Sequence, residues 1–446
     1  MKTTTCWAFA STTSTLVSAI QLISRSNPSV LSLDLSRKTT NLSPVARDRA
    51  RIKKRSSLQL TLDNEQTLYF ANVSLGTPGQ SLRLDIDTGS SDLWANSAVS
   101  TLCQQYAQQC SASGVYNANS SSTYQYLNSD FYIKYADSSY AQGDYAADTV
   151  TMGQTSITSV PFGIGYKSTS AQGILGVGYP TNEASVSTTG KTYQNLPQIL
   201  AQNKVTNTPS YSLWLNDLDA NTGSILFGGV DTEKFTGSLA TLPIIKEDGV
   251  YREFIIALTG VTAGGQTVLS SSSPVPVLLD SGSSLSYLPT TYAQSLFTIF
   301  SATYSSQSGA ATVNCNLMSN TATVDFSFSG VTISVPMNEL VIVDGTRNGR
   351  QVCILGISDA GDSTAVLGDT FLRSAYVVYD LSNNQISLAP TNFNATKSNV
   401  EEIASGTSGV PGASLVANAV TTLSVATGGA RGPSVSTIPS GGNVNT

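Results

Sequence analysis

The sequence of 446 residues contains no histidine. This absence excludes nucleophilic catalysis by a Ser-His-Asp or Cys-His arrangement, and it excludes a zinc site with histidine ligands. A chain of this size can lack histidine by chance, so the absence removes rival mechanisms without selecting one. From the sequence we expect neither a metal nor a cofactor.

Charged residues are also scarce, at 12% of the chain, roughly half the share of an average soluble protein. Tyr, Ser, Thr and Gly take their place, which favours strands and turns over helices. Residues 20–55 hold nine Lys or Arg and two Asp, whereas residues 56–446 hold 13 basic and 27 acidic residues. The acidic body argues against nucleic acid as a partner. With few basic side chains, it is expected to tolerate acid.

Long apolar runs are missing, apart from one near the start. Lys2 precedes a moderately apolar stretch, 6–17, and Val17-Ser18-Ala19 has the small residues of a signal cleavage site. We therefore predict a signal peptide over 1–19 and a secreted protein. No other stretch is long enough to cross a bilayer. Residues 441–446 are polar, which is not the hydrophobic end of a GPI signal.

The basic segment 20–55 ends in Lys53-Lys54-Arg55 and is followed by Ser56-Ser57. A dibasic end after a signal peptide and before a strand-rich body predicts a pro-segment, cut by a convertase after Lys54-Arg55. A solvated run of charges is the alternative. The basic pro-segment would lie over the acidic body as an intramolecular inhibitor until acid or cleavage releases it.

Between Leu58 and about Pro390, short strand-like runs alternate with turns. The clearest strand predictions are 68–75, 131–135 and 376–379. Two helices are predicted at 195–203, which has Pro near its start, and at 290–304, which Thr290 or Thr291 would cap.

The composition changes beyond Asn394. Residues 403–446 are rich in Ser, Thr, Gly, Val and Ala, and Arg431 is the one basic residue among them. We predict a disordered tail over 392–446, suited to O-glycans and to a cell-wall tether. N-glycosylation is predicted at Asn119 and Asn394. Asn72 also heads an acceptor motif but falls within a predicted strand, so it is the least favoured.

Four of the five cysteines form one pair per half of the chain, Cys103 with Cys110 and Cys315 with Cys353; Cys6 lies in the leader. Four cysteines allow three connectivities, and the intervals favour two local disulfides in an oxidising compartment. Free thiols are the alternative.

The most informative feature is a repeated tetrapeptide. Asp-Thr-Gly-Ser at 87–90 has a near copy, Asp-Ser-Gly-Ser, at 280–283, and each follows an apolar run, 82–86 or 275–279. One copy would be an ordinary turn. Two copies after strand-like runs suggest two halves that each contribute one carboxylate. Two carboxylates brought together can share a proton, which makes them an acid–base pair.

Residues from about 68 to 390 resemble pepsin-family aspartic proteases. Several separate motifs carry the resemblance: the first strand and turn at 69–78, the loop at 87–94 that ends in Trp94, a flap-like hairpin around Tyr135 that ends near 143–144, the apolar-apolar-Gly segments at 173–176 and 366–372, and both cysteine pairs. The segment 280–289 and the dibasic pro-segment end are more similar to fungal candidapepsins and yapsins than to pepsin.

The resemblance implies an all-β, bilobal fold: two pseudo-symmetric β lobes, 56–240 and 241–391, a central cleft and a flap hairpin, in a monomer. It assigns catalysis to Asp87 and Asp280. It also implies supporting roles for the loop residues: tight turns at Gly89 and Gly282, hydroxyl ties between the loops from Thr88 and Ser281, hydrogen bonds to the outer carboxylate oxygens from Ser90 and Ser283, and a flap Tyr135 paired with Trp94.

Cleaving a peptide bond without a covalent intermediate needs an activated water and an acid. Two facing aspartates that hold one proton supply both. The resemblance therefore implies a secreted, acid-active endopeptidase, made as a zymogen, that cuts proteins or peptides and binds pepstatin-type inhibitors. The alternative is a catalytically silent pepsin-like binding or inhibitor protein.

Asp85 departs from the family pattern. In an unbroken strand it shares the face of Asp87, where relatives usually carry an apolar residue on the floor of the pocket for the residue before the scissile bond. Our hypothesis is that Asp85 adapts that pocket to Lys or Arg. An internal pair with Arg83 is the alternative. Asp137 and Tyr287 are further expected pocket residues.

Overall fold

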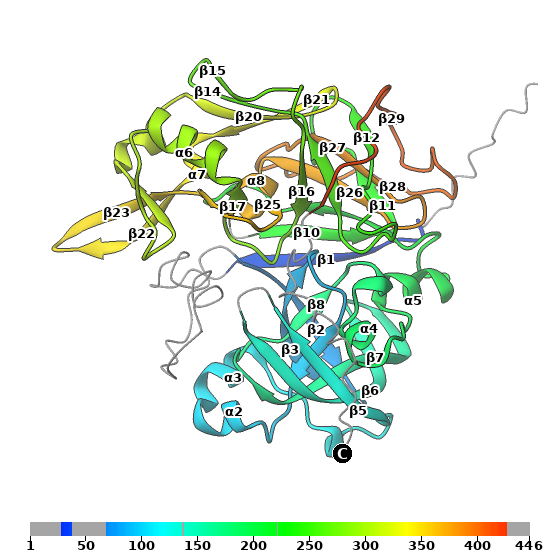
Figure 1. The fold of residues 1–446 in the computed structure, drawn as a ribbon. Coiled ribbons are helices and arrows are strands. Elements are labelled where there is room, and N and C mark those ends of the chain that lie inside the picture. The colour runs from blue at the N-terminus through cyan, green and yellow to red at the C-terminus, as the bar shows by residue number, and fades with distance from the viewer. Residues whose placement is uncertain (1–27, 38–67, 136–137, 221, 426–446) are drawn as a thin grey trace, which may run out of the picture.

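The computed structural model describes residues 28–37, 68–135, 138–220 and 222–425. The predicted signal peptide, the dibasic site at 53–55 and Asp137 lie outside these residues. Figure 1 shows two β-rich halves one above the other, with strands β1 and β10 between them. The prediction of an all-β protein in two lobes is confirmed.

The largest sheet runs through both halves. Among the described residues its order is β29-β12-β27-β26-β9-β10-β1-β2-β3-β8-β4-β7-β6-β5. In chain order its strands are β1 (Leu31–Arg37), β2 (Tyr69–Leu75), β3 (Gln80–Asp87), β4 (Leu93–Asn96), β5 (Gln125–Lys134), β6 (Tyr140–Met152), β7 (Thr155–Ser168), β8 (Ile174–Gly176), β9 (Ser210–Trp214), β10 (Thr222–Phe227), β12 (Leu239–Pro243), β26 (Ala375–Asp380), β27 (Gln385–Pro390) and β29 (Ala413–Leu415).

Smaller sheets complete the C-terminal half. One contains β13 (Ile255–Leu258), β16 (Val275–Leu279), β25 (Ala365–Leu367), β17 (Ser286–Leu288) and β24 (Ile357–Asp359); a second contains β15 (Gln266–Leu269), β14 (Gly260–Ala263), β20 (Thr323–Phe328) and β21 (Val331–Pro336); a third contains β18 (Thr303–Ser305), β19 (Ala310–Val313), β23 (Arg350–Leu355) and β22 (Val341–Arg347); and a two-stranded sheet pairs β11 (Gly229–Asp231) with β28 (Val400–Glu402).

The helices of the described residues are short. They are α2 (Thr101–Gln105), α3 (Ala107–Ser113), α4 (Ala184–Thr189), α5 (Leu196–Gln202), α6 (Thr290–Ile299), α7 (Met337–Leu340) and α8 (Asp369–Leu372), with 3-10 turns η1 (Ala118–Ser120), η2 (Pro180–Asn182) and η3 (Cys315–Ser319). The helix predicted at 195–203 is confirmed as α5.

The helix predicted at 290–304 was drawn too long. It ends at Ile299, because Ser301 adopts a positive φ of 52° and the chain then enters β18. The cap was also wrong, since Pro289 occupies the N-cap position and the Thr290 hydroxyl instead donates to Asp359, at 2.7 Å. A left-handed residue that is not glycine leaves no clear signal in the sequence.

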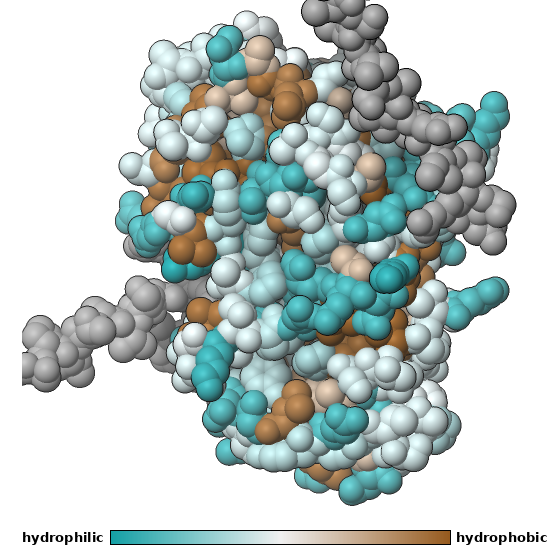
Figure 2. All heavy atoms as spheres, turned by 90° about the vertical axis from the view of Figure 1, so that its right-hand side faces the viewer, coloured by the Kyte–Doolittle hydropathy of each residue, from teal (hydrophilic) through white to brown (hydrophobic). Residues whose placement is uncertain are grey.

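The strand predictions hold, although burial alternates in only part of them: β26 is buried throughout, while the end of β5 alternates between buried and exposed side chains. In β20 the side chains alternate between half-buried and buried, as expected for a strand with one face on the core. The predicted strands at 68–75, 131–135 and 376–379 correspond to β2, the end of β5 and β26. One large apolar core draws residues from both halves. On the face in Figure 2, apolar side chains form separate patches among polar ones.

Part of the predicted pro-segment is built into the largest sheet. Strand β1 pairs along its length with β10 and, at Ser36 and Arg37, with β2. Leu31, Leu33 and Leu35 are buried in the main core, while the side chains between them are exposed. The segment that joins β1 to the body, 38–67, lies outside the described residues.

The predicted lobe boundary between residues 240 and 241 falls inside β12, which pairs with β27 in the shared sheet. The two halves are therefore joined through one continuous sheet at this point. No described helix is long and apolar enough to cross a membrane.

The prediction of a disordered tail from residue 392 is wrong for residues 392–425, which we call the C-terminal strap. Its strands β28 and β29 pair with β11 and β12. Ile403 and Val410 are buried against Trp214 and Tyr376. The composition misled the prediction because a few apolar side chains among Ser and Gly are enough to attach a strap to an existing surface. Residues 426–446 lie outside the described residues.

Candidate active site

Both repeated motifs sit at the ends of equivalent strands. Strand β3 ends at Asp87 and runs parallel to β8, while β16 ends just before Asp280 and runs parallel to β25. The backbone fixes each turn: the Val177 amide donates to the Asp87 carbonyl at 3.0 Å, and the Asp280 amide donates to the Leu367 carbonyl at 3.1 Å. The apolar-apolar-Gly segments thus support the two loops, as the resemblance implied.

Each carboxylate is held by its own loop in the same way. The Gly89 amide donates to Oδ1 of Asp87 at 2.8 Å, and the Ser90 hydroxyl donates to Oδ2 at 2.5 Å. In the second loop the corresponding distances are 2.9 Å from the Gly282 amide and 2.7 Å from the Ser283 hydroxyl, both to Asp280. Two donors per carboxylate fix the plane of its oxygens.

The two loops are also bonded to each other. The Thr88 hydroxyl donates to the Leu279 carbonyl at 2.9 Å, and the Ser281 hydroxyl donates to the Ile86 carbonyl at 2.8 Å. In addition, the Ser281 amide donates to the Thr88 hydroxyl at 3.0 Å, and the Thr88 amide donates to the Ser281 hydroxyl at 3.2 Å. All of these groups are buried, so the exchange determines how the two halves face each other.

The glycines lie where the carboxylates meet. A Cβ atom at Gly89 would be 2.5 Å from Oδ1 of Asp280, and one at Gly282 would be 2.6 Å from Oδ1 of Asp87 and 3.1 Å from Oδ1 of Asp280. A single atom at Gly282 would therefore touch both carboxylates. Only glycine leaves this space free, and both aspartates keep 6% of their surface exposed.

Tyr135 lies at the tip of the β5–β6 hairpin, the predicted flap. Its phenol oxygen accepts a hydrogen bond from Nε1 of Trp94 at 2.7 Å. Trp94 is buried and packs near Phe131 of the same hairpin, with ring centres 6.4 Å apart. The indole that follows the first motif thus holds the flap tyrosine in place.

The family model of eukaryotic aspartyl proteases matches residues 68–391, which include both loops and the hairpin. The chain belongs to this family. It is 54% identical to the probable aspartic-type endopeptidase opsB of Aspergillus oryzae, over 93% of this chain and 86% of that protein. It is 39% identical to secreted aspartic protease 8 of Candida albicans, over 78% of this chain and 81% of that protein.

The crystal structure of the aspartic proteinase from Irpex lacteus matches with a TM-score of 0.64 and 21% identity, over 83% of this chain and 100% of that one. The expected pepsin-like fold is thereby confirmed. The predicted enzyme class is confirmed by the family and the relatives: the chain is an aspartic-type endopeptidase, a hydrolase that acts on peptide substrates.

Two buried tyrosines lie close to the loops of this aspartyl protease. The rings of Tyr211 and Tyr379 stack with centres 4.8 Å apart. Burial raises the pKa of both phenols far above the ordinary value, with smaller contributions from charged neighbours that include Asp87 for Tyr211 and Asp280 for Tyr379. Both therefore stay neutral and add no charge beside the carboxylates.

The predicted pocket residues Asp85 and Tyr287 lie in different halves of the molecule. Asp85 lies in the unbroken strand β3, two residues before Asp87, and is buried. Tyr287 lies in β17, half-buried against a small apolar cluster of the C-terminal half. Arg83, the alternative partner of Asp85, has its guanidinium carbon 4.1 Å from the centre of the Phe70 ring.

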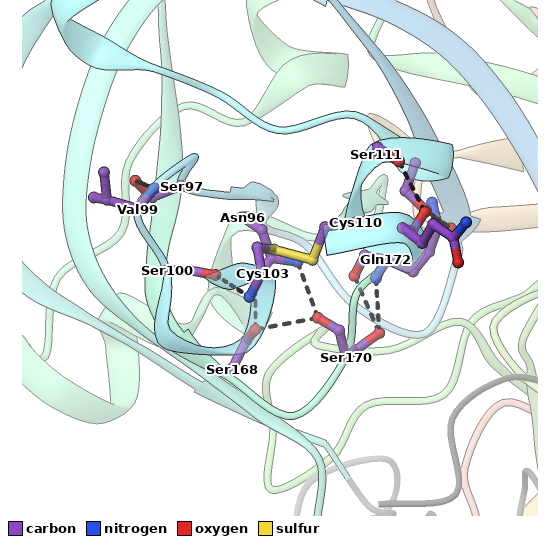
Figure 3. The surroundings of a disulfide bond; sticks show 12 residues. Asn96, Ser97, Val99, Ser100, Cys103, Cys110, Ser111, Ser168, Ser170 and Gln172 are labelled. Atoms are coloured by element: carbon purple, nitrogen blue, oxygen red, sulfur yellow. Dashed lines mark hydrogen bonds between the residues drawn. A yellow bond between two sulfur atoms is a disulfide. The ribbon is translucent and has the colours of Figure 1, made fainter. Parts of the chain in front are cut away.

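Both predicted disulfides form, Cys103–Cys110 and Cys315–Cys353. The first joins α2 to α3 beside the end of β7 (Figure 3), where the Ser100 hydroxyl accepts the Cys103 amide at 3.1 Å. Asn119 and Asn394 are exposed, and so is Asn72 on strand β2. The strand placement of Asn72 was predicted correctly, but it does not hide the side chain.

Sequence reasoning missed a buried ion pair between Arg373, which follows α8, and Glu339 of α7. The Arg373 guanidinium donates to the Glu339 side chain at 2.5 Å and to its backbone carbonyl at 2.6 Å, and both residues are fully buried. Leaving either charge alone there would cost several kcal/mol. No periodicity relates two residues 34 positions apart in separate segments, so no local signal could have revealed the pair. The described residues hold no cluster of three His, Cys, Asp or Glu placed for a metal ion.

Proposed function

We propose that Asp87 and Asp280 are the catalytic pair of this endopeptidase. The observation that carries the proposal is that each motif glycine faces the opposite carboxylate, within an arrangement of hydrogen bonds that the two loops mirror. Two carboxylates this close hold one proton between them, because a second negative charge at short range is costly.

The reaction follows from that shared proton. The ionised aspartate takes a proton from a water, whose oxygen bonds to the peptide carbonyl carbon, while the protonated aspartate donates to the carbonyl oxygen. The C–N bond then breaks as the nitrogen receives a proton from one aspartate and a hydroxyl of the tetrahedral intermediate returns its proton to the other, giving a carboxylic acid, an amine and a pair that again holds one proton. Because one proton must stay bound, activity lies in the acid range.

The enzyme is further proposed to be secreted and made as a zymogen. One relative is named a secreted aspartic protease, and both cysteine pairs are oxidised in the fold, which suits an extracellular protein. The basic segment 20–55 acts as the inhibitor in this scheme, and its strand β1 already pairs with β10 and β2. The mature enzyme acts as a monomer, and the end of the chain allows attachment to a cell wall.

The catalytic pair is tested by Asp87→Asn and Asp280→Asn. Each should abolish cleavage of casein or haemoglobin near pH 3–4, together with the pepstatin-sensitive part of the wild-type activity. Asp130→Asn, an exposed aspartate on β5, is the control and should retain activity. Full activity in either motif variant would refute the two-aspartate mechanism. A wild-type protein that binds pepstatin without cutting either substrate would favour the silent binding protein instead.

Asp85 is proposed to adapt the pocket before the scissile bond to Lys or Arg. Its position in the same unbroken strand as Asp87 supports this, because residues two apart share a face. Cleavage of a peptide library by Asp85→Asn should lose Lys and Arg at that position while keeping apolar residues. If use of basic residues is unchanged, Asp85 has no such role, and the internal pair with Arg83 is favoured. Tyr287 and Asp137 remain proposed pocket residues.

A further inference from the structure

A buried carboxylate beside the active site is not used by the proposed mechanism. Asp92 lies two residues after Ser90 and is fully buried. Its Oδ1 accepts the hydroxyls of Tyr145 at 2.8 Å and Tyr193 at 3.0 Å, and its Oδ2 accepts the Ala184 amide at 2.8 Å. Buried charges persist only when several donors compensate them, and these donors come from two segments, strand β6 and residues 182–195.

The segment 182–195, which includes α4, lies against the first catalytic loop. Besides the two contacts with Asp92, the Asn182 amide group donates to the Gly89 carbonyl at 3.2 Å, and that of Asn195 donates to the Ser91 carbonyl at 3.4 Å. Residues 182–195 therefore hold the loop from one side. Tyr193 belongs to this segment and not to the flap.

Tyr145 connects Asp92 to the flap. It lies in β6, the second strand of the hairpin, and its ring meets that of Phe131 in β5 edge-on, with centres 5.2 Å apart. Phe131 in turn packs near Trp94, which holds Tyr135. These aromatic side chains form an apolar cluster of their own, separate from the main core.

The side chains of this cluster are closely packed. A Cβ atom at Gly163 of β7 would lie 2.4 Å from the Phe131 ring, so that ring fills the space above the glycine. A close-packed cluster passes on small shifts, because neighbouring side chains have no room to absorb them. The base of the flap is thus closely packed, and the hydrogen bond from Tyr145 to Asp92 attaches it to the catalytic loop.

We propose that Asp92 is a positioning residue that fixes the base of the flap to the first catalytic loop, acting through Tyr145. The proposal rests on the proposed function, since it takes Asp87 as catalytic and Tyr135 as the residue that closes over substrate. Asp92 is fully buried and acts through its contact with Tyr145. It sets the height of the flap above the carboxylates, and therefore the affinity for an extended peptide.

Two tyrosine variants make a matched pair for the test. Tyr145→Phe and Tyr193→Phe each remove one hydroxyl from the same oxygen of Asp92, and each leaves Asp92 two other donors. Asp92 stays hydrogen-bonded in both variants, so both should fold. They differ in one respect: Tyr145 belongs to the flap hairpin and Tyr193 does not.

The processed enzyme is assayed with a fluorogenic peptide and with pepstatin. Losing one hydrogen bond to a charged group costs about 1.5 kcal/mol, so Tyr145→Phe should raise KM and the pepstatin inhibition constant roughly ten-fold, with kcat and the pH profile nearly unchanged. Tyr193→Phe should lose a similar free energy as folding stability, seen as a lower melting temperature, while its KM stays within about two-fold of wild type.

A spectroscopic readout separates flap position from general stability. In a Trp214→Phe background, Trp94 reports on the flap, and its fluorescence change on pepstatin binding should shrink in Tyr145→Phe only. Equal effects of both variants on KM, or no effect of Tyr145→Phe, would overturn the role of Asp92 while leaving the catalytic pair standing. A wild-type enzyme without pepstatin-sensitive activity would instead overturn the proposed function itself.

Discussion

Thr88 and Ser281 show how single residues set the geometry of the whole site. Each follows a proposed catalytic aspartate in sequence, yet its hydroxyl binds a carbonyl of the opposite loop. Thr88 and Ser281 are fully buried or nearly so. The roles that the family resemblance implied for these two residues agree with the hydrogen bonds they make.

Replacing Thr88 with Val should destabilise the enzyme by about 2 kcal/mol, because the Leu279 carbonyl and the Ser281 amide lose their buried partner. Urea unfolding at fixed acidic pH measures this. Thr88→Ser keeps the hydroxyl and should stay within about 1 kcal/mol of wild type. Equal losses in both variants would show that the methyl packing matters and the hydroxyl tie does not.

Asp344 should make stability depend on pH. Burial raises its pKa from 3.8 to about 6, opposed in part by Arg347. A raised pKa means that the folded state binds the proton more tightly than the unfolded state, so stability falls as pH rises from about 4 to about 6. Melting temperatures of Asp344→Asn should lack this fall. If wild type and variant follow parallel curves from pH 3 to 7, the residue does not titrate as described.

At the scale of elements, the parts that follow one period were predictable and the parts defined by contacts were not. Strands β2 and β26 and helix α5 carry clear patterns in their own residues. The end of α6 depends on one left-handed serine, and the C-terminal strap depends on a surface that exists only after the lobes fold. The disulfides were predicted because cysteine is rare and each half holds one pair, and the motifs were found because nearly the same tetrapeptide occurs twice.

The C-terminal strap should contribute to stability. Ending the chain after residue 391 exposes the surface that Ile403 and Val410 cover, and it leaves β11 and β12 each without one neighbour. Burying two such side chains is worth roughly 3–6 kcal/mol at most. We expect a melting temperature lower by several degrees.

A chain ended after residue 425 is the control for that truncation. It removes 426–446 only and should melt with the full chain. Differential scanning calorimetry on secreted protein compares the three lengths. An unchanged melting temperature for the shorter form would mean that the strap is attached without stabilising the fold.

At the scale of the whole molecule, the proposed catalytic pair is assembled by two halves that share a sheet and a core. Strand β1 lies in the middle of that sheet, between β10 and β2. The predicted cut after Arg55 would therefore break the covalent connection between β1 and the rest of the chain, while β1 stays hydrogen-bonded to both of its neighbouring strands. Sequence alone located the basic segment, but it did not show that seven of its residues belong to the sheet.

Maturation should fail when the dibasic site is removed. Changing Lys54 and Arg55 to Ala should leave the secreted protein longer at its start, as intact-mass analysis would show, and inactive until acidified. Arg51→Ala, in the same basic run, should be processed normally. Normal processing of the double variant would place the cut elsewhere or exclude a convertase that recognises basic pairs.

The crossed hydrogen bonds of Thr88 and Ser281 mean that neither half of the enzyme can form a complete active site alone. A half produced alone would present a hydroxyl with no carbonyl to reach and a carboxylate with no counterpart, so it should be inert. Two halves supplied as separate chains would regain cleavage only when they dock in register. Proteolysis would then report on their association, with no signal from either piece by itself.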